Sequence, residues 1–452
     1  MRLTLLHATR SGYKVIPKGI RPIAFIAFFF LFSISVHAQF TNIDTTKLAD
    51  PSITVYPNTA AGEFTPGKGF LIVKNPFASL NISIYAMARW VNQLPGETTW
   101  LDHRDSLRVF DGRNDIYWHR TMIWFTGFLG TPKLTYMATV WTVTTTQQTL
   151  VYGNVNYQFS KRLTAGIGIA PNACIRTLQG PFPLFSSTDR TMAEDALRGG
   201  FTNGVYISGE VLPRLRYLAV LGNNLSILGI KASNLTRHYS KSASLSWFPT
   251  TGEFGPRGGN GDFESHEKIA TRFGISYCHS RENRFNNVGT PAPDNTQVRL
   301  SDGVLFFETG AMAPGVTVIE ANFDQTSVDL GMKYKGLAVH TELYYRTLSK
   351  IDATGPVPLD LITDKGYTLQ VLYMLVPKKL CVYGINSMLI DEFKRNPYEV
   401  GGGVNIYPTK TRSWRINAQA MHIYKGASGG TFGLYTAGQT GTTLTIGTDI
   451  LL

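Results

Sequence analysis

The stretch Ser79–Val91, SLNISIYAMARWV, decides the fold class because its side chains change character at every second residue. Apolar residues occupy one set of positions and mostly polar or larger residues occupy the other: Leu80, Ile82, Ile84, Ala86, Ala88 and Trp90 against Asn81, Ser83, Tyr85, Met87 and Arg89. A period of two places the sets on opposite faces of a β-strand. A tilted strand needs about 9–11 residues to cross a bilayer, so the segment is long enough to do so.

The same alternation recurs along the chain and is cleanest in its second half. Clear examples are Thr149–Phe159, Gly204–Val211, Ser327–Lys335, Leu337–Arg346, Trp414–His422 and Thr442–Leu452. Fourteen segments are clear or moderate strands, and the phase is unclear over Asn114–Phe128, Lys133–Thr144 and Val316–Phe323. Because single-chain bacterial barrels have even strand numbers, we predict an all-β fold. It is a transmembrane antiparallel β-barrel of about sixteen strands, with long outer loops and short periplasmic turns.

A secreted β-sandwich that binds a partner is the main alternative fold, because its strands alternate in the same way. Only 16% of the residues are charged, which is low for a soluble surface of this size. Short turns alternate with long polar connections, and the chain ends on a strand. Aromatic residues gather at strand ends, as in interfacial girdles: Trp90, Tyr136, Trp141, Tyr157, Tyr217, Trp247, Tyr407 and Trp414. These features favour the barrel.

The N-terminal residues predict export. Residues 1–21 carry five basic and no acidic residues, and an apolar run of about fifteen residues follows Pro22 and ends in Val36-His37-Ala38. The run is shorter than the roughly 20 residues of a membrane-spanning helix. We predict a signal peptide over 1–38, a periplasmic segment over 39–68 and a barrel over 69–452. The expected location is the outer membrane of a Gram-negative bacterium, in contact with its lipid and lipopolysaccharide.

Charge and cysteine content exclude several classes of protein. The formal charge is +12, but the predicted signal removes five of the 43 basic residues, which leaves 38 against 31 acidic ones, or +7. This diffuse excess, without a recognisable motif, argues against nucleic acid as a partner. Three scattered cysteines, Cys174, Cys278 and Cys381, predict no disulfide framework.

A barrel of this size encloses water, so its function should lie in the lumen. We predict passive diffusion of small hydrophilic solutes. A basic side chain facing lipid costs about 2–4 kcal/mol at the midplane, so charged residues should face inward. The candidate pore-lining residues are Arg89, Arg216, Lys268, Arg272, Lys333, Glu342, Arg346 and Arg415. Their basic groups favour anions, while Asp329, Glu342 and Asp449 face the same way and oppose that preference.

A long segment over 171–203 is the candidate constriction. Within it, DRTMAEDAL predicts a short helix with Asp189 as its N-cap. The segment either folds inward and narrows the pore or stays outside as a surface loop. The candidate constriction residues are Asp189, Arg190, Glu194, Asp195 and Arg198.

A second irregular segment, over 247–267, is rich in glycine and predicts a sharply turning loop. Asp262, Glu264 and Glu267 offer carboxylates to a hard cation such as Ca²⁺, but their spacing does not match an EF-hand. The alternative is a packed, hydrogen-bonded outer loop. We predict no metal site and no cofactor.

Several stretches resemble the phosphate-selective porin family. They are Trp247–Gly255 (WFPTTGEFG), Gly261–Lys268 (GDFESHEK), Ala270–Arg272 (ATR), Arg299–Gly303 (RLSDG) and Gly222–Ser226 (GNNLS). The resemblance runs from about residue 66 to the C-terminus. It implies a sixteen-stranded, trimeric porin with inward-folded loops. The phosphate-binding arginines and lysines of the named members cannot be matched to positions here. The ending Ile450-Leu451-Leu452 departs from the aromatic residue that usually ends such barrels.

Two further functions compete with the porin. An outer-membrane enzyme would need a nucleophile or activated water beside a base, and the sequence has no H-E-x-x-H motif. We therefore predict that the protein is not an enzyme. A barrel that serves a larger uptake or secretion complex, without pore activity of its own, remains an alternative.

Overall fold

The computed structural model describes residues 65–110, 112–144, 148–226, 238–286, 288–290, 292–427 and 433–452. The predicted signal peptide and most of the predicted 39–68 segment lie outside these residues. Among the described helices, none has the length and apolar character that a membrane crossing requires. Nearly all regular structure is β-strand, in one large sheet and one small hairpin.

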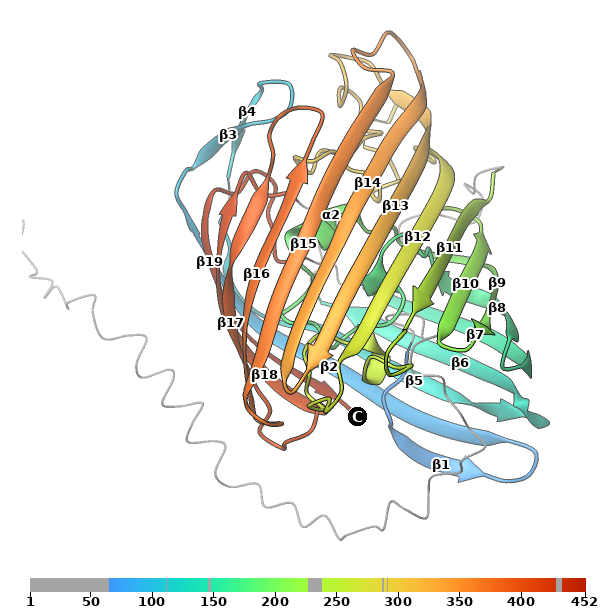
Figure 1. Ribbon diagram of the computed structural model, residues 1–452. Helices are drawn as coiled ribbons and strands as arrows, with labels where there is room; N and C mark the ends of the chain where they lie inside the picture. Colours follow the sequence, from blue (N-terminus) through green and yellow to red (C-terminus); the bar gives the residue numbers. More distant parts are fainter. Residues whose placement is uncertain are drawn as a thin grey trace, which may run out of the picture. The chain divides into compact units, whose positions relative to one another are not determined.

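Sixteen antiparallel strands close into a barrel, which confirms the predicted fold class and strand number (Figure 1). Consecutive strands pair along the chain, and β19 closes the sheet by pairing Gly441–Leu451 with Tyr85–Pro95. The strands are β2 (Ser79–Pro95), β5 (Asn114–Leu129), β6 (Thr131–Val143), β7 (Gln148–Ser160), β8 (Leu163–Pro171), β9 (Phe201–Leu212), β10 (Leu215–Gly222), β11 (Ser240–Trp247), β12 (Ala270–Asn283), β13 (Val318–Tyr334), β14 (Leu337–Ala353), β15 (Leu361–Val376), β16 (Leu380–Ile390), β17 (Tyr398–Ile406), β18 (Trp414–Tyr424) and β19 (Gly441–Leu451).

Three short strands do not belong to the sixteen strands of the closed barrel. β1 (Phe70–Lys74) pairs with the first residues of β2, and β3 (Thr99–Leu101) forms a separate hairpin with β4 (Leu107–Val109). The described helical segments are α2 (Met192–Leu197) and the 3₁₀ turns η4 (Arg176–Leu178) and η6 (Pro256–Gly258).

The two ends of the barrel differ in loop length, as the sequence predicts. One end has short connections at 130, 161–162, 213–214, 335–336 and 377–379, and the other end carries the long loops. The C-terminus lies at the short-turn end (Figure 1). The connection over 248–269 is the exception, because it is long and yet joins β11 to β12 at the short-turn end. The interpretation of this segment as an outer loop was therefore wrong.

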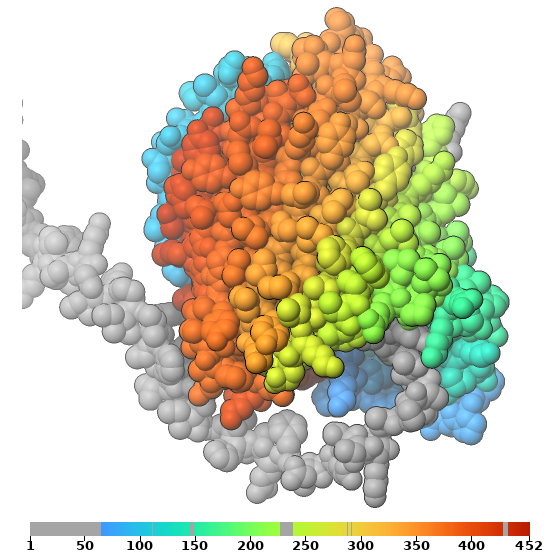
Figure 2. All heavy atoms as spheres, viewed as in Figure 1, coloured from blue at the N-terminus to red at the C-terminus, as the bar shows by residue number. Residues whose placement is uncertain are grey.

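The strands expose apolar side chains outward, as a lipid-facing wall requires. Val151 is 71% exposed, Ile167 is 62% exposed and Leu343 is 52% exposed. The space-filling view shows the outer surface of the wall formed by the later strands (Figure 2). Two of the predicted girdle aromatics do not belong to this surface. Trp141 packs inside against Phe201, and Tyr407 is buried against Phe263.

Candidate functional site in the barrel lumen

The predicted pore-lining residues mostly face inward, but protein surrounds them. Arg89 on β2, Arg272 on β12, Lys333 on β13, Glu342 and Arg346 on β14 and Arg415 on β18 are each at most 6% exposed. Arg216 on β10 is half-buried, with its guanidinium 4.9 Å from the Phe248 ring centroid. Lys268 lies before β12 and is exposed. The inward charges therefore meet loops that occupy the lumen.

Three of the inward arginines pair with a carboxylate on the next strand. Arg272 Nε lies 2.5 Å from Asp329 Oδ1. Arg346 Nη2 lies 2.5 Å from Asp364 Oδ2, and Arg415 Nη2 lies 2.5 Å from Asp449 Oδ2. In each pair one arginine cancels the charge of one acid. Buried charges need such partners, since an unpaired one would keep its full desolvation cost. The pairs add almost no net charge to the lumen.

The segment Asn172–Gly200, here called the crossbar loop, crosses the lumen between β8 and β9. It is buried over almost its whole length. At its start, Cys174 forms a disulfide with Cys278 of β12, with the two Cα atoms 5.0 Å apart. The scattered cysteines predicted no disulfide framework, and their spacing did not indicate this single bond. The two cysteines are 104 residues apart, and only the inward fold of the loop brings them together.

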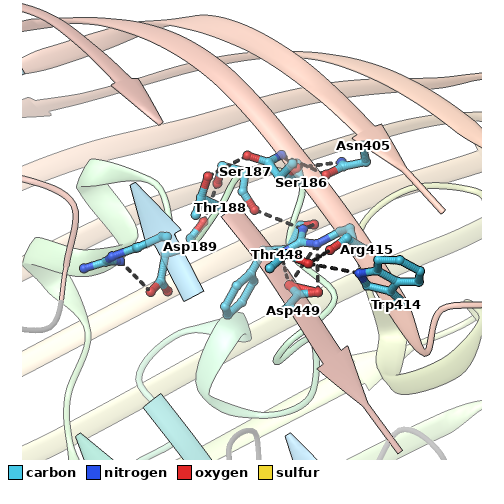
Figure 3. Close-up of polar contacts among 12 residues, drawn as sticks. Ser186, Ser187, Thr188, Asp189, Asn405, Trp414, Arg415, Thr448 and Asp449 are labelled. Atoms are coloured by element: carbon cyan, nitrogen blue, oxygen red, sulfur yellow. Dashed lines mark hydrogen bonds and ion pairs between the residues drawn. The ribbon is translucent and has the colours of Figure 1, made fainter. Parts of the chain in front are cut away.

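The opposite wall holds the middle of the crossbar loop (Figure 3). Arg415 Nη1 donates to the carbonyl oxygens of Phe185 at 2.6 Å and Ser187 at 3.0 Å. Asn405 Nδ2 donates to the carbonyl oxygen of Ser186 at 2.8 Å. Because Arg415 also pairs with Asp449, one guanidinium holds both the wall and the loop.

The helix α2 completes the crossbar loop. Thr191 caps it in a capping box with Glu194, so the predicted helix exists but the predicted N-cap, Asp189, was two residues early. Its first backbone amide, Met192 N, donates to Glu399 Oε1 on β17 at 2.7 Å. Asp195 pairs with Arg198 at 3.2 Å. The helix is therefore fastened to the wall at its N-terminal end.

Asp189 instead lies at the centre of a basic cluster. Arg120 of β5 contacts its carboxylate, Arg89 Nη1 lies 3.6 Å from Asp189 Oδ2, and the backbone N–H of Arg190 donates to Asp189 Oδ1 at 2.9 Å. The Arg190 guanidinium lies over the Phe185 ring. The guanidinium groups of Arg120 and Arg89 thus lie beside this one carboxylate, which gathers basic side chains on this side of the lumen. The sequence did not predict that Arg120 lines the lumen, because the alternation is unclear over Asn114–Phe128.

The segment Phe248–Ile269, here called the mouth loop, enters the lumen from the short-turn end. Lys333 Nζ donates to the carbonyl oxygens of Phe254 at 2.8 Å and Gly259 at 2.7 Å. Arg257 Nη1 donates to the carbonyl oxygen of Thr65 at 2.7 Å. Lys333 thus holds the loop by two of its backbone carbonyl groups, and the loop's own Arg257 binds the segment before β1.

The three carboxylates considered for a cation are not gathered by the mouth loop. Asp262 accepts the backbone N–H of Gly336 at 2.7 Å, and Glu264 pairs with Arg412 at 3.1 Å. Glu267 is exposed. Burial alone would raise the pKa of Glu264, but the Arg412 guanidinium lowers it overall. Over the described part of the chain, no group of acidic, His and Cys side chains is placed to hold a metal ion.

The crossbar loop and the mouth loop meet inside the barrel. Arg176 of the crossbar loop donates to Asn260 Oδ1 at 2.9 Å and to the carbonyl oxygen of Gly258 at 2.5 Å. In return, Asn260 N donates to the carbonyl oxygen of Leu184 at 2.9 Å. A cavity of about 10 Å³ beside Arg176, His340 and Glu342 has room for about one water.

The inward side chains of β7–β10 are less covered. Those that remain partly accessible are Asn156, Gln158, Thr164, Tyr206, Glu210 and Arg216. Tyr206 donates to Asn156 Oδ1 at 2.6 Å, and Glu210 is the register partner of Arg216. This side of the lumen therefore combines neutral hydrogen-bonding groups with one acid and one base.

Comparisons with known proteins support the architecture. No family model matches the chain, and no curated protein does. Outer-membrane expressed OmpT of Vibrio cholerae superposes with a TM-score of 0.50 at 12% identity, covering 84% of this chain and 100% of that one. An anion-selective porin from Comamonas acidovorans gives a TM-score of 0.47 at 9% identity, covering 83% and 100%. At 12% identity the likeness to the first of these concerns the fold alone, which is that of an outer-membrane barrel. The phosphate-selective porin family stays a prediction.

Proposed function

We propose that the protein is an outer-membrane porin in which two loops narrow the lumen. Support comes from the closed sixteen-stranded wall and its apolar outer surface. The observation that carries the proposal is the crossbar loop, which the Arg415 guanidinium and a disulfide fix across the lumen. A solute path alongside β7–β10 fits the partial exposure of their inward polar groups. Small hydrophilic solutes are the class that such a path admits.

The proposed ion selectivity follows from where basic side chains gather in the lumen. Three wall arginines are each cancelled by one carboxylate. Beside Asp189, the guanidinium groups of Arg89 and Arg120 lie near one carboxylate, and such a grouping of basic side chains attracts anions. We therefore propose a weak anion preference. The resemblance to phosphate-selective porins points in the same direction but assigns no residue.

The proposed setting is the outer membrane of a Gram-negative bacterium. Short turns face the periplasm in such barrels, so the long-loop end would face outward, into the lipopolysaccharide leaflet. A homotrimer is the assembly that the family resemblance implies.

A second function is favoured by the burial of most inward side chains. A barrel whose lumen is filled could serve a larger uptake or secretion complex without conducting by itself. The same measurement separates the two functions.

The test is the conductance of the purified protein in a planar bilayer under a salt gradient. The proposal expects small, stepwise conductance with a reversal potential on the anion side. Absence of steps, both in the natural protein and after trimming of the crossbar loop, would reject the porin and favour the complex component. A cation-side reversal potential would reject the role of the Asp189 cluster.

A further inference from the structure

The outward-facing charges of the wall are distributed very unevenly. Strands β7–β10 carry only two charged residues, Glu210 and Arg216, and both face inward as register partners. The wall from β11 to β15 instead carries basic residues at outward-facing positions near the long-loop end of these strands. They are Lys241, His279, Arg281, Lys350 and Lys365, here called the basic rim.

The members of the basic rim are neighbours across the sheet. Lys241 of β11 is the register partner of His279 of β12. Arg281 follows two residues later on the same face, and its Nη1 donates to the carbonyl oxygen of Lys350 at 2.8 Å. Lys365 of β15 is the register partner of Tyr345. The rim therefore forms one surface rather than a set of scattered charges.

Aromatic residues mark the height of the rim on the wall. Tyr277 and Tyr345 are each 47% exposed and face outward beside it. Exposed tyrosines gather at the boundary between hydrocarbon and headgroups. Lysine and arginine next to them can lie along the apolar wall and reach the headgroup layer with their charged ends. The rim is thus level with lipid headgroups.

Acidic side chains offset only part of the rim. Asp324 accepts His279 Nδ1 at 2.9 Å and the Tyr277 hydroxyl at 2.7 Å, and Glu320 pairs with Arg281 at 3.0 Å. Lys241, Lys350 and Lys365 are exposed. Among the described residues, no carboxylate forms an ion pair with these three lysines. Asp352 is also exposed beside Lys350, so three acids lie near four permanently basic residues of the rim. The rim keeps a small positive excess that a membrane anion can neutralise.

We propose that the basic rim binds the phosphorylated headgroup of an outer-leaflet lipid. This rests on the proposed function in one respect, that the long loops face outward. Phosphate carries the charge that the three lysines lack, and the acyl chains of the same lipid would lie on the apolar wall below. The uncharged wall of β7–β10 offers no such site.

The test removes three charges from the rim and, in a matched control, three from the short-turn end. The rim variant is Lys241→Gln/Lys350→Gln/Lys365→Gln. The control is Lys161→Gln/Lys378→Gln/Lys379→Gln, all exposed turn residues. Binding of purified diphosphorylated lipid A to each detergent-solubilised barrel is measured by native mass spectrometry. Inorganic phosphate in the same titration distinguishes a headgroup from free phosphate.

The expected result is a loss of lipid A affinity in the rim variant on the order of 100-fold, because each basic residue near an anionic membrane surface contributes about fivefold. The control should bind as the natural protein does. Equal binding by both variants, equal loss in both, or competition by inorganic phosphate as effective as lipid A would overturn the proposal. Heat-dependent gel mobility verifies that each barrel is folded. Conductance in a bilayer without lipid A should be unchanged, so failure of this proposal is distinct from failure of the porin.

Discussion

The crossbar loop and the mouth loop fill the same lumen but are held in different ways. The crossbar loop is joined to the wall by a disulfide and by side chains such as Arg415, which is itself paired with Asp449. The mouth loop is held by hydrogen bonds from Lys333 and to Gln370 of the wall and by contacts with the neighbouring turns at Gly336 and Arg412. Its middle part also contacts Arg176 and the carbonyl of Leu184, which belong to the crossbar loop. The comparison indicates that the crossbar loop is joined to the wall covalently and by a buried ion pair, whereas the middle of the mouth loop, residues 258–260, also depends on the crossbar loop.

The largest effect should follow removal of the crossbar loop. Replacing residues 178–198 by a short Gly/Ser linker takes away the helix and the wall contacts of its middle part. Single-channel conductance should rise severalfold, because a sixteen-stranded barrel is wide enough to hold water. The mouth loop should then become sensitive to protease.

The matched control replaces residues 254–261 of the mouth loop by the same linker. Here the crossbar loop keeps its wall contacts, so the rise in conductance should be smaller and the crossbar loop should stay protected. Equal effects of the two replacements would contradict the unequal dependence of the loops.

Arg415→Ala should give the largest loss of stability by a single substitution. It leaves Asp449 buried without its partner and two loop carbonyls without a donor. Breaking a buried pair costs about 3–5 kcal/mol, measurable as a shift of the urea unfolding curve. Arg412→Ala breaks a partly exposed pair with Glu264 and should cost less than about 1 kcal/mol. Similar losses in both variants would count against the central place of Arg415.

The next largest loss of stability should follow removal of the Cys174–Cys278 disulfide. Cys174→Ser frees the start of the crossbar loop from β12 and should lower the free energy of unfolding by about 2–4 kcal/mol. Current noise through the channel should increase because one fastening of the loop is gone. Unchanged noise together with unchanged stability would show that the side-chain contacts alone hold the loop.

Lys333→Met tests the mouth loop and keeps the length of the side chain. Two backbone carbonyls, those of Phe254 and Gly259, lose their donor, at a cost of about 1–3 kcal/mol. Protease cleavage should increase in the mouth loop alone. Cleavage within the crossbar loop as well would mean that the crossbar loop depends on the mouth loop.

The smallest effect on stability should come from lowering the pH, which protonates Glu264. Arg412 holds the pKa of Glu264 below its ordinary value despite burial. A carboxyl with a lowered folded pKa adds stability that is present above its unfolded pKa, near 4.3, and is lost as pH falls through the folded pKa. Because the pair is partly exposed, the loss should stay well under about 1 kcal/mol. Titration by NMR of Glu264 checks the direction, and a midpoint above the ordinary glutamate value would contradict it.

The sequence predicted the barrel because the alternation survives in most strands. The alternation is unclear in the strands whose backbone departs from a regular β-ladder. In β5, Met87 pairs with Arg120 and Ala88 with Trp118, so His119 is an extra residue that shifts the phase. Register shifts at Glu320 blur β13 in the same way.

In β6 the cause is different, since both faces are apolar. Met137 and Trp141 face inward and pack against the buried crossbar loop, so the inner face has no polar signature. For the same reason Trp141 was taken for a girdle residue. A period-two pattern distinguishes the inner face of a strand from its outer face only when one of the two contacts water.

The sequence predicted which charged side chains of the candidate site face the lumen, but not which partners they contact there. Inward arginines such as Arg272 and Arg346 follow from the high cost of a charge in lipid. Their carboxylate partners lie on neighbouring strands, and pairing depends on register, which the sequence pattern does not specify. The contact of Cys174 with Cys278 likewise depends on where the loop folds. A long, glycine-rich segment does not show from which end it enters.

The most direct test of the account is a cross-link between the two loops inside the lumen. A Cβ atom on Gly259 would lie 2.7 Å from Leu184 Cβ, about 1 Å closer than the roughly 3.5–4.5 Å between Cβ atoms in disulfides, so the two loops must move apart by about that distance. The variant Leu184→Cys/Gly259→Cys should form a disulfide under mild oxidant, seen by mass spectrometry of the digested barrel. Two free thiols in a folded barrel would contradict the meeting of the loops.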